Sequence, residues 1–325
     1  MNKKIAIIIP FFGNLNCKGY FQRFLDSCEI NSQITWFIFT DDKTPYKYPP
    51  NIKITYMRFE DLKEIIQKKY DFQIKLHTSY KLCDFKPAYG DIFESYISDY
   101  DWWGYADIDL IWGCVDHFIS DDLLNSYEQL YSRGHLTLSR NNEKMRMLYR
   151  DSGGIELYKK IFSEEKHYAF DELHKEGGFR EIVKRLEISL YDRLDFADVA
   201  KSNRFGVFSF ELAQVQLKKE ERGIGASMFV WNSGNIYRIY FIKGKICKKE
   251  YLYVHFQRRV LTDKAVSREV YGIVPNMIVS VPAQMTAKEV YLKHCNRSNI
   301  RYGFRMINER MLCILNRVYN RMKNR

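Results

Sequence analysis

The first half of the chain alternates short apolar runs with amphipathic segments. The pattern predicts strands at residues 5–9, 34–39, 52–57 and 102–105, and the first of them is a continuous apolar run, typical of a buried parallel strand. Apolar side chains at helical spacing lie between them, at residues 20–28, 59–70 and 87–97. Pro87 suits the first turn of the last helix. This strand–helix rhythm predicts an α/β fold, with a mostly parallel sheet flanked by helices.

The second half of the chain is less regular. The pattern predicts a helix over residues 118–131, a strand over 135–138 and a loop at 151–154 that opens another helix. Apolar and polar residues alternate from 200 to 256, which predicts a smaller part made of antiparallel strands. We therefore predict an α/β domain over residues 1–260, followed by a helical basic extension over 261–325.

The extension has the pattern of an amphipathic basic helix. Apolar residues between Phe304 and Val318 recur at helical spacing, and Arg and Lys are frequent with few acids. Such a helix can lie on an anionic membrane surface, so we expect peripheral association with the membrane. The alternative is a helix that packs on the body of the protein and exposes a solvated basic face.

Composition narrows the class of protein. With 325 residues, of which 46% are hydrophobic, the chain can bury a large core. No run approaches the roughly 20 apolar residues that cross a bilayer, and the apolar start is too short for a signal peptide. The 7 cysteines are scattered without paired spacing, which predicts reduced thiols. We expect a cytoplasmic protein.

The net charge of +11 indicates an anionic partner, which is a nucleic acid, a membrane or a phosphate-bearing substrate. The sequence contains no aromatic strand of the kind that RNA-binding modules use, so no nucleic-acid partner is expected. A glycine-rich phosphate loop of the Gly-x-x-x-x-Gly-Lys-Ser/Thr type is also absent from the sequence.

The strongest chemical signal is Asp107-Ile108-Asp109, which follows the aromatic-rich run at 102–105. Two carboxylates one residue apart at a strand end can both reach a divalent cation. Mg²⁺ and Mn²⁺ prefer such oxygen ligands, and substrate phosphates complete their coordination. The alternative is a solvated turn with two surface carboxylates.

Two other polar or turn-forming segments also come directly after the C-terminal end of a predicted strand. They are Pro10-Phe11 after the first strand and Asp41-Asp42 after the second. Ligands of parallel sheets bind outside the carboxyl ends of the strands. We therefore expect these segments and the Asp107–Asp109 pair to converge on one crevice.

Six segments resemble bacterial GT-A glycosyltransferases from capsule and lipopolysaccharide gene clusters. They are Ile8-Ile-Pro-Phe-Phe-Gly13, Phe39-Thr-Asp-Asp42, Asp84-Phe-Lys-Pro87, Tyr105-Ala-Asp-Ile-Asp-Leu-Ile-Trp-Gly113, Ala169-Phe-Asp-Glu172 and Val254-His-Phe-Gln257. The resemblance implies an enzyme that moves a sugar from a nucleotide sugar to a glycan or lipid-linked acceptor. By analogy the nucleotide is UDP. Residues 1–115 would bind the nucleotide and residues 116–260 the acceptor.

The resemblance also assigns roles to individual residues. Asp109 would ligate Mn²⁺ or Mg²⁺, and Asp107 would contact the ribose or the metal. His255, at the end of an alternating strand, would add a nitrogen ligand to the metal. The nucleoside would be held by Pro10, Phe11, Phe12, Gly13, Asp41 and Asp42. The His-Gly-Lys-Pro-Trp type of pattern found in retaining enzymes is absent after His255.

Lys86 and Asp84 are further candidates for contact with the nucleotide. Pro87 predicts an extended backbone at Lys86, and a cation at a helix N-terminus opposes the helix dipole. A bound anion would remove this conflict. The alternative is a turn-forming Asp84 and a solvent-exposed Lys86.

Asp171 and Glu172 are the candidates for the catalytic base. The resemblance to inverting enzymes places a carboxylate that deprotonates the acceptor hydroxyl in this part of the chain. The alternative is a pair of ordinary acids at a helix start.

Two other classes of protein stay open at this point, namely a non-catalytic basic protein that binds membrane or RNA and a nucleotidyltransferase of similar fold.

Overall fold

The computed structural model describes most of the chain. Its described residues are 2–151, 157–172, 178–199, 205–209, 216–217, 227–257 and 259–282, with Thr286, Lys288, Glu289, Leu292 and Met311. The predicted loop at 151–154, apart from its first residue, and almost all of the predicted basic helix lie outside the described residues. The chain forms two compact units. Unit 1 comprises Met1–Cys17, Phe21–Leu110 and Cys114–Asp195, and unit 2 comprises Lys18–Tyr20, Ile111–Gly113 and Phe196–Arg325.

Unit 1 is built on a seven-stranded sheet. From edge to edge its strands are β3 (Ile52–Tyr56), β2 (Ile34–Thr40), β1 (Ile5–Pro10), β4 (Trp102–Ala106), β7 (Leu136–Arg140), β6 (Gln129–Arg133) and β8 (Leu190–Tyr191). The first four run parallel, whereas β7 is antiparallel to both β4 and β6. The α/β class is confirmed, and the sheet is mixed.

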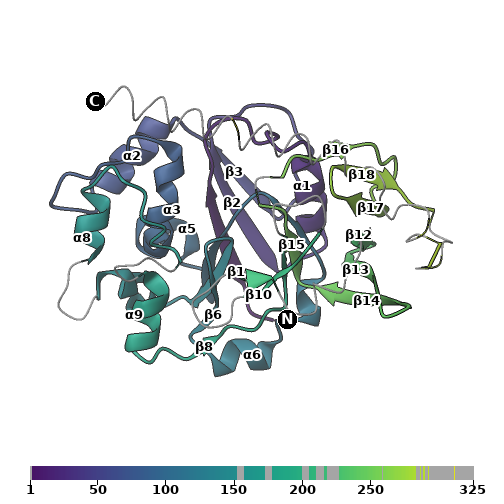
Figure 1. Cartoon of the computed structure of the whole chain (residues 1–325). Helices are drawn as coiled ribbons and strands as arrows, with labels where there is room; N and C mark the ends of the chain where they lie inside the picture. The colour runs from purple at the N-terminus through teal and green to yellow at the C-terminus, as the bar shows by residue number, and fades with distance from the viewer. Residues whose placement is uncertain are drawn as a thin grey trace. The chain divides into compact units, whose positions relative to one another are not determined.

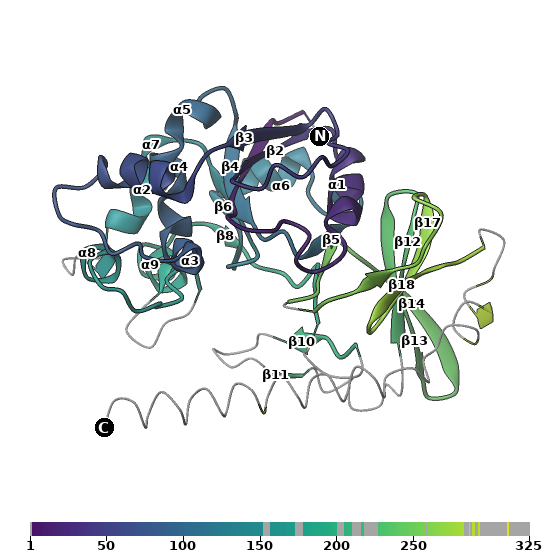
Figure 2. The same ribbon diagram turned by 90° about the horizontal axis from the view of Figure 1, so that it is seen from above.

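The sheet of unit 1 carries helices on both faces (Figures 1 and 2). The α-helices are α1 (Phe21–Glu29), α2 (Phe59–Gln67), α3 (Leu82–Phe85), α4 (Tyr89–Ile92), α5 (Glu94–Ile97), α6 (Asp121–Ser126), α7 (Glu143–Met147), α8 (Leu157–Phe162) and α9 (Phe179–Arg185). Short 3₁₀ turns are η1 (Ser79–Lys81), η2 (Lys86–Ala88), η3 (Val115–His117) and η4 (Leu148–Arg150). Helix α1 lies on one face, and α2 to α5 with α7 to α9 lie on the other.

The continuous apolar runs explain why these strands are central. In β1, Ala6 and Ile8 join the large core under α2 to α5, while Ile5, Ile7 and Ile9 are buried on the opposite face. Both faces therefore need apolar side chains, as in sheets covered by helices on each side. The predicted helices at 20–28 and 59–70 correspond to α1 and α2.

Two local predictions are wrong. The segment 118–131 is not one helix, because α6 ends at Ser126 and the residues after it form β6, which pairs with β7. Lys86 is not extended before Pro87, because its backbone has φ −50° and ψ −45° within a run of short helical turns. Lys86 is both the residue that ends α3 and the first residue of the 3₁₀ turn η2.

Unit 2 contains a six-stranded, largely antiparallel sheet. Its strands in spatial order are β14 (Lys245–Tyr251), β13 (Asn235–Ile242), β12 (Ser227–Asn232), β17 (Val270–Val274), β18 (Met277–Ser280) and β16 (Thr262–Asp263). A three-stranded sheet has the order β5 (Leu110–Trp112), β15 (Tyr253–His255) and β9 (Ala197–Asp198), and β10 (Phe208–Ser209) pairs with β11 (Gln216–Leu217).

The division into units differs from the predicted domain boundaries. The predicted boundary at residue 260 falls inside unit 2, because β17 pairs with β12 and extends the same sheet. The predicted halves 1–115 and 116–260 also differ from the units, because unit 1 continues to Asp195. Within the described residues, no helix is long and apolar enough to cross a membrane.

Candidate functional site

Three parallel strands of unit 1 end at the same edge of its sheet. Strand β1 lies between β2 and β4 and is parallel to both. The segment after β1 begins at Phe11, Asp41 follows β2, and Asp107 follows β4. The topology therefore brings the three predicted segments of unit 1 to one edge, where α/β sheets bind their ligands.

Asp41 and Asp42 hold the loop that follows β1. The Asp41 carboxylate accepts a hydrogen bond from Gly13 N at 2.7 Å, and Asp42 accepts one from Leu15 N at 2.8 Å. Gly13 has φ +100°, a conformation that residues with a side chain rarely adopt. Burial opposes the charge on Asp42, but hydrogen bonds from Thr44 and Leu15 lower its pKa. The loop predicted to hold the nucleoside is thus fixed by two carboxylates.

Asp107 and Asp109 are both partly exposed at the end of β4. One carboxylate oxygen of each lies within 4.8 Å of the other. Their hard oxygen ligands at this spacing suit a divalent cation such as Mg²⁺ or Mn²⁺. A positive group already lies against Asp107, since Lys86 Nζ is 2.7 Å from its Oδ1. The residues of this strand end therefore fit a cation.

Lys86 is buried, which excludes the alternative of a solvent-exposed side chain. Its Nζ donates to Asp107 Oδ1 and to the carbonyl oxygen of Gly134 at 2.8 Å, and lies 3.4 Å from Asp171 Oδ2. Burial opposes the ammonium charge. The charge of Asp107, supported by Asp171 and the hydrogen bond, outweighs burial and raises the pKa of Lys86 well above its usual value. Lys86 thus links the predicted cation ligand to the predicted base.

Asp171 is a buried carboxylate with a raised pKa. Burial raises its pKa to about 7, against the attraction of Lys86, and the neighbouring charge of Glu172 adds to the increase. Glu172 Oε1 accepts a hydrogen bond from Gly134 N at 3.1 Å. A carboxylate with a pKa near neutrality has the property expected of a general base or acid.

Gly134, in the turn between β6 and β7, is a site residue that the sequence reasoning missed. Its carbonyl accepts from Lys86, and its amide donates to Glu172. A Cβ atom at this position would lie 2.5 Å from Asp171 Oδ2 and 3.0 Å from Glu172 Oε1. Only glycine allows both carboxylates to approach this backbone so closely. A lone glycine has no sequence signal of its own.

Asp84 supports the segment that carries Asp171. Its carboxylate is fully buried and accepts hydrogen bonds from the backbone amides of Tyr168 and Phe170 and from Lys81 Nζ. These amides flank Ala169, whose φ of +54° is unusual for a residue with a side chain. Asp84 therefore fixes a strained turn just before Asp171. Its predicted contact with a nucleotide stays a prediction.

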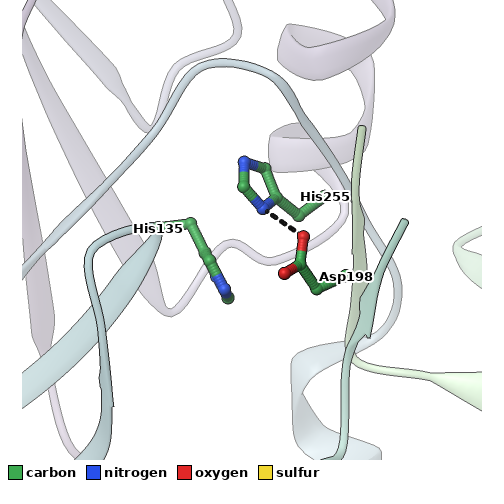
Figure 3. A group of neighbouring side chains, drawn as sticks. All are labelled: His135, Asp198 and His255. Atoms are coloured by element: carbon green, nitrogen blue, oxygen red, sulfur yellow. Dashed lines mark hydrogen bonds and ion pairs between the residues drawn. The ribbon is translucent and has the colours of Figure 1, made fainter. Parts of the chain in front are cut away.

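Within unit 2, His255 is paired with a carboxylate that the sequence reasoning also missed (Figure 3). His255 Nδ1 lies 2.8 Å from Asp198 Oδ1, and Gln257 Nε2 donates to the same oxygen at 3.0 Å. The two residues face each other because β15 and β9 are parallel with His255 in register with Asp198. Asp198 stands in a short strand whose sequence has no motif.

The fold and these groups define unit 1 as an α/β unit with an acidic and cationic cluster at the carboxyl edge of its sheet. The chain belongs to a family of unknown function (DUF6625), whose model matches residues 7–282. A comparison with curated proteins finds no match.

Among solved structures, the chain is similar to two glycosyltransferases. One is the glycosyltransferase GlyE of Streptococcus pneumoniae TIGR4, with 14% identity and a TM-score of 0.31, over 60% of this chain and 46% of GlyE. This chain therefore matches less than half the length of GlyE. The other is the galactosyltransferase LgtC in complex with donor and acceptor sugar analogues, with 11% identity and a TM-score of 0.31, over 60% of this chain and 75% of LgtC.

Proposed function

We propose that the protein is a metal-dependent glycosyltransferase that moves a sugar from a nucleotide sugar to a glycan or lipid-linked acceptor. By analogy with the family that the sequence resembles, the nucleotide is UDP. The observation that carries the proposal is the cluster of Asp107, Lys86 and Asp171 at the end of β4, in which an ammonium bridges two carboxylates. Metal-dependent glycosyl transfer with inversion needs a cation site for a diphosphate and a separate base for a hydroxyl, and this cluster provides candidates for both.

The donor would bind at the edge where β1, β2 and β4 end. The loop of Pro10, Phe11, Phe12 and Gly13 would hold the nucleoside, supported by Asp41 and Asp42. Asp107 and Asp109 would hold Mn²⁺ or Mg²⁺, which as a Lewis acid stabilises the diphosphate leaving group. Following the sequence resemblance, we also propose that His255 adds a nitrogen ligand.

Lys86 would exchange its partner when the donor binds. In the structure its ammonium neutralises Asp107. With Asp107 holding a metal ion, Lys86 would be left to pair with Asp171 and with a phosphate oxygen of the donor. Buried between two acids, Lys86 keeps its charge, so it contributes a fixed positive group where the leaving group develops negative charge.

Asp171 would act as the base. The acceptor hydroxyl oxygen forms a bond to the anomeric carbon as the bond from that carbon to the diphosphate oxygen breaks. The nucleoside diphosphate leaves with the electron pair, and Asp171 takes the hydroxyl proton. Glu172 would hold Gly134 and thereby the position of Asp171. Asp84 would act indirectly, by fixing the turn at Ala169.

The cellular role is also part of the proposal. The sequence resemblance assigns the enzyme to bacterial surface polysaccharide synthesis, with an acceptor at the inner face of the cell membrane. The basic extension over 261–325 would bring the protein to that membrane. Vesicle binding of the full chain, measured with and without competing salt, tests this attachment, because electrostatic binding to lipid weakens as salt rises.

The deciding experiment measures nucleoside diphosphate release from a panel of nucleotide sugars, with and without Mn²⁺. The wild type is compared with Asp109→Ala, Asp171→Asn and, as a matched control, Asp116→Ala, which changes an exposed acid outside the cluster. We expect release from one donor that requires Mn²⁺, Asp109 and Asp171 but not Asp116. Release of pyrophosphate would instead identify a nucleotidyltransferase. Failure of every donor to bind in a metal-dependent manner would contradict the proposal.

A further inference from the structure

The pair of Asp198 and His255 fixes one form of the imidazole. A carboxylate accepts hydrogen bonds only, so the short contact to Nδ1 requires a proton on that nitrogen. In the neutral ring, the lone pair then lies on Nε2. Asp198 is buried, and Gln257, with φ +51°, donates its amide to the same oxygen. The carboxylate is thus held from two sides in the orientation that selects this tautomer.

We infer that Asp198 is a positioning residue that presents His255 Nε2 to a divalent cation. A carboxylate behind a ligating imidazole fixes the ring and raises its basicity, and its loss weakens metal affinity. The inference rests on the proposed function, because it takes His255 as a ligand of the cation. It goes beyond that function because it gives Asp198, which is not itself a proposed ligand of the cation, the role of orienting the ligand His255.

The first measurement reads the tautomer without metal. Long-range ¹H–¹⁵N spectra of the full chain report which ring nitrogen of His255 carries the proton, and His255→Ala identifies its signal. We expect the Nδ1–H form in the wild type and a mixture of tautomers in Asp198→Asn, which lacks the charge. The control is Asp263→Asn, which removes an exposed acid of the same unit. It should leave the spectrum of His255 unchanged.

The second measurement is Mn²⁺ affinity by calorimetry in the presence of UDP. Asp198→Asn should raise the Kd for Mn²⁺ about 10- to 100-fold, as expected for loss of a carboxylate behind a ligand. Unchanged tautomer and affinity in Asp198→Asn would overturn the inference. Mn²⁺ binding that depends on Asp198 but is equal in wild type and Asp109→Ala would overturn the proposed function instead.

A second, independent observation concerns the hairpin of β13 and β14 in unit 2. Its turn, Lys243-Gly244, has φ of +49° and +75°, as in the narrow turns that suit twisted hairpins. Strand β14 is the edge of the sheet. Exposed lysines lie along this hairpin, and the sequence from 241 to 249 contains no acid. Lys243 and Lys245 stand at the turn, whereas Lys248 and Lys249 lie further along β14, opposite Ile239 and Arg238 and over the rings of Tyr237 and Tyr251. The hairpin therefore carries four positive charges, two of them at its tip.

The hairpin tip also exposes apolar surface. Phe241 is 41% exposed and stands next to Ile242 at the turn. Lysines on an edge strand prevent pairing with another sheet, but this role accounts for neither Lys243 in the turn nor an exposed aromatic ring. Aromatic and apolar residues flanked by cations suit the headgroup region of an anionic bilayer. We propose that this hairpin tip docks on an anionic lipid surface.

Vesicle sedimentation of the full chain tests this docking. The vesicles contain equal parts of phosphatidylcholine and phosphatidylglycerol, with pure phosphatidylcholine for comparison. One variant changes the four hairpin lysines to Glu, another is Phe241→Ser, and the matched control changes Lys53, Lys68, Lys144 and Lys184 to Glu. The control lysines are exposed residues of unit 1 and give the same change in net charge.

We expect the hairpin variant to bind the anionic vesicles at least about tenfold more weakly than the control, and Phe241→Ser to fall between them. Equal binding of the hairpin and control variants would overturn the proposal. A hairpin variant that keeps vesicle binding but loses binding to an RNA oligomer would also overturn it, and would assign the tip to nucleic acid.

Discussion

Lys86 sets the charge balance of the cluster in unit 1. Its ammonium lies between Asp107 and Asp171, and its side chain is only 8% exposed. Removing one partner of a buried ion pair leaves an uncompensated charge in a poorly solvated place. The stability of this part of unit 1 should therefore depend on Lys86 far more than on the surface lysines.

We predict that Lys86→Met lowers the free energy of unfolding by about 3 kcal/mol at pH 8. The loss should be smaller near pH 5, because Asp171 is then protonated and needs no counter-charge. Urea denaturation at both pH values measures the effect. Lys63→Met is the control, since Lys63 pairs with Glu60 on the surface of α2, and such pairs contribute less than about 1 kcal/mol. Equal losses in the two variants would contradict the prediction.

Asp171 makes a separate prediction about pH. Its pKa is raised from 3.8 to about 7, so the native state favours the protonated acid more than the unfolded state does. That contribution to stability is fully present below about pH 4 and is lost as pH rises through about 7. Asp171→Asn should remove this part of the slope of stability against pH, which amounts to roughly 2–4 kcal/mol in this window. Denaturation curves from pH 4 to pH 8 measure it.

Enzymatic turnover should rise with pH, whereas the contribution of Asp171 to stability falls. A base must be ionised, so turnover at saturating donor should rise as pH increases through about 7, the pKa of Asp171. A flat profile between pH 5 and pH 8, with full turnover in Asp171→Asn, would exclude Asp171 as the base.

At the scale of elements, the turn between β6 and β7 positions the cluster. The backbone of Gly134 hydrogen-bonds to Lys86 and Glu172, and the carboxylates of Asp171 and Glu172 occupy the space where a side chain would be. Strand β7 pairs with β4, and Asp107 directly follows β4. The register of this pair therefore decides how the predicted base and the predicted cation ligand face each other.

We predict that Gly134→Ala lowers kcat by roughly 100-fold, because a shift of about 1 Å at a reacting group has an effect of that size. The affinity for metal and nucleotide should change little, since Asp109 and the loop after β1 are untouched. Steady-state kinetics together with nucleotide titration separate the two effects. Ser126→Ala, an exposed change at the end of α6, is the control. A Gly134→Ala enzyme with normal kcat would refute this role of the turn.

Sequence patterns predicted the elements that depend on local periodicity. The apolar runs of β1, β2 and β4 and the amphipathic stripes of α1 and α2 are visible in the sequence, and so is the Asp-x-Asp pair at a strand end. The pairing of β7 between β4 and β6 depends on long-range hydrogen bonds that leave no local signal. The same holds for the burial of Lys86 and for the partners Gly134 and Asp198, which are defined by three-dimensional contacts alone.

At the scale of the whole molecule, the two units share the chain in an interleaved manner. Residues Lys18–Tyr20 and Ile111–Gly113 belong to unit 2 although they are surrounded in sequence by unit 1. Both contribute contacts: Trp231 Nε1 donates to the carbonyl of Trp112 at 2.9 Å, and the ring of Tyr20 packs against Phe256. Unit 2 is thus complete only when these distant segments are present.

We predict that a fragment of residues 196–325 does not fold alone. It lacks β5, which borders β15 in the three-stranded sheet, and it leaves the buried Trp231 without its acceptor. Circular dichroism and one-dimensional NMR should show a chain without dispersed signals, whereas the full chain unfolds cooperatively. A well-dispersed spectrum of the fragment would contradict the prediction.

The interleaved chain also has a consequence for how members of this family diverge. A unit encoded by one continuous stretch can be exchanged between genes in a single recombination event. Unit 2 is encoded in three stretches, one of which begins at Ile111, two residues after Asp109. A crossover that replaces its largest stretch would separate it from the two short ones. New specificities in this lineage should therefore arise by point substitutions and by changes within loops, and the two units should share one history of descent.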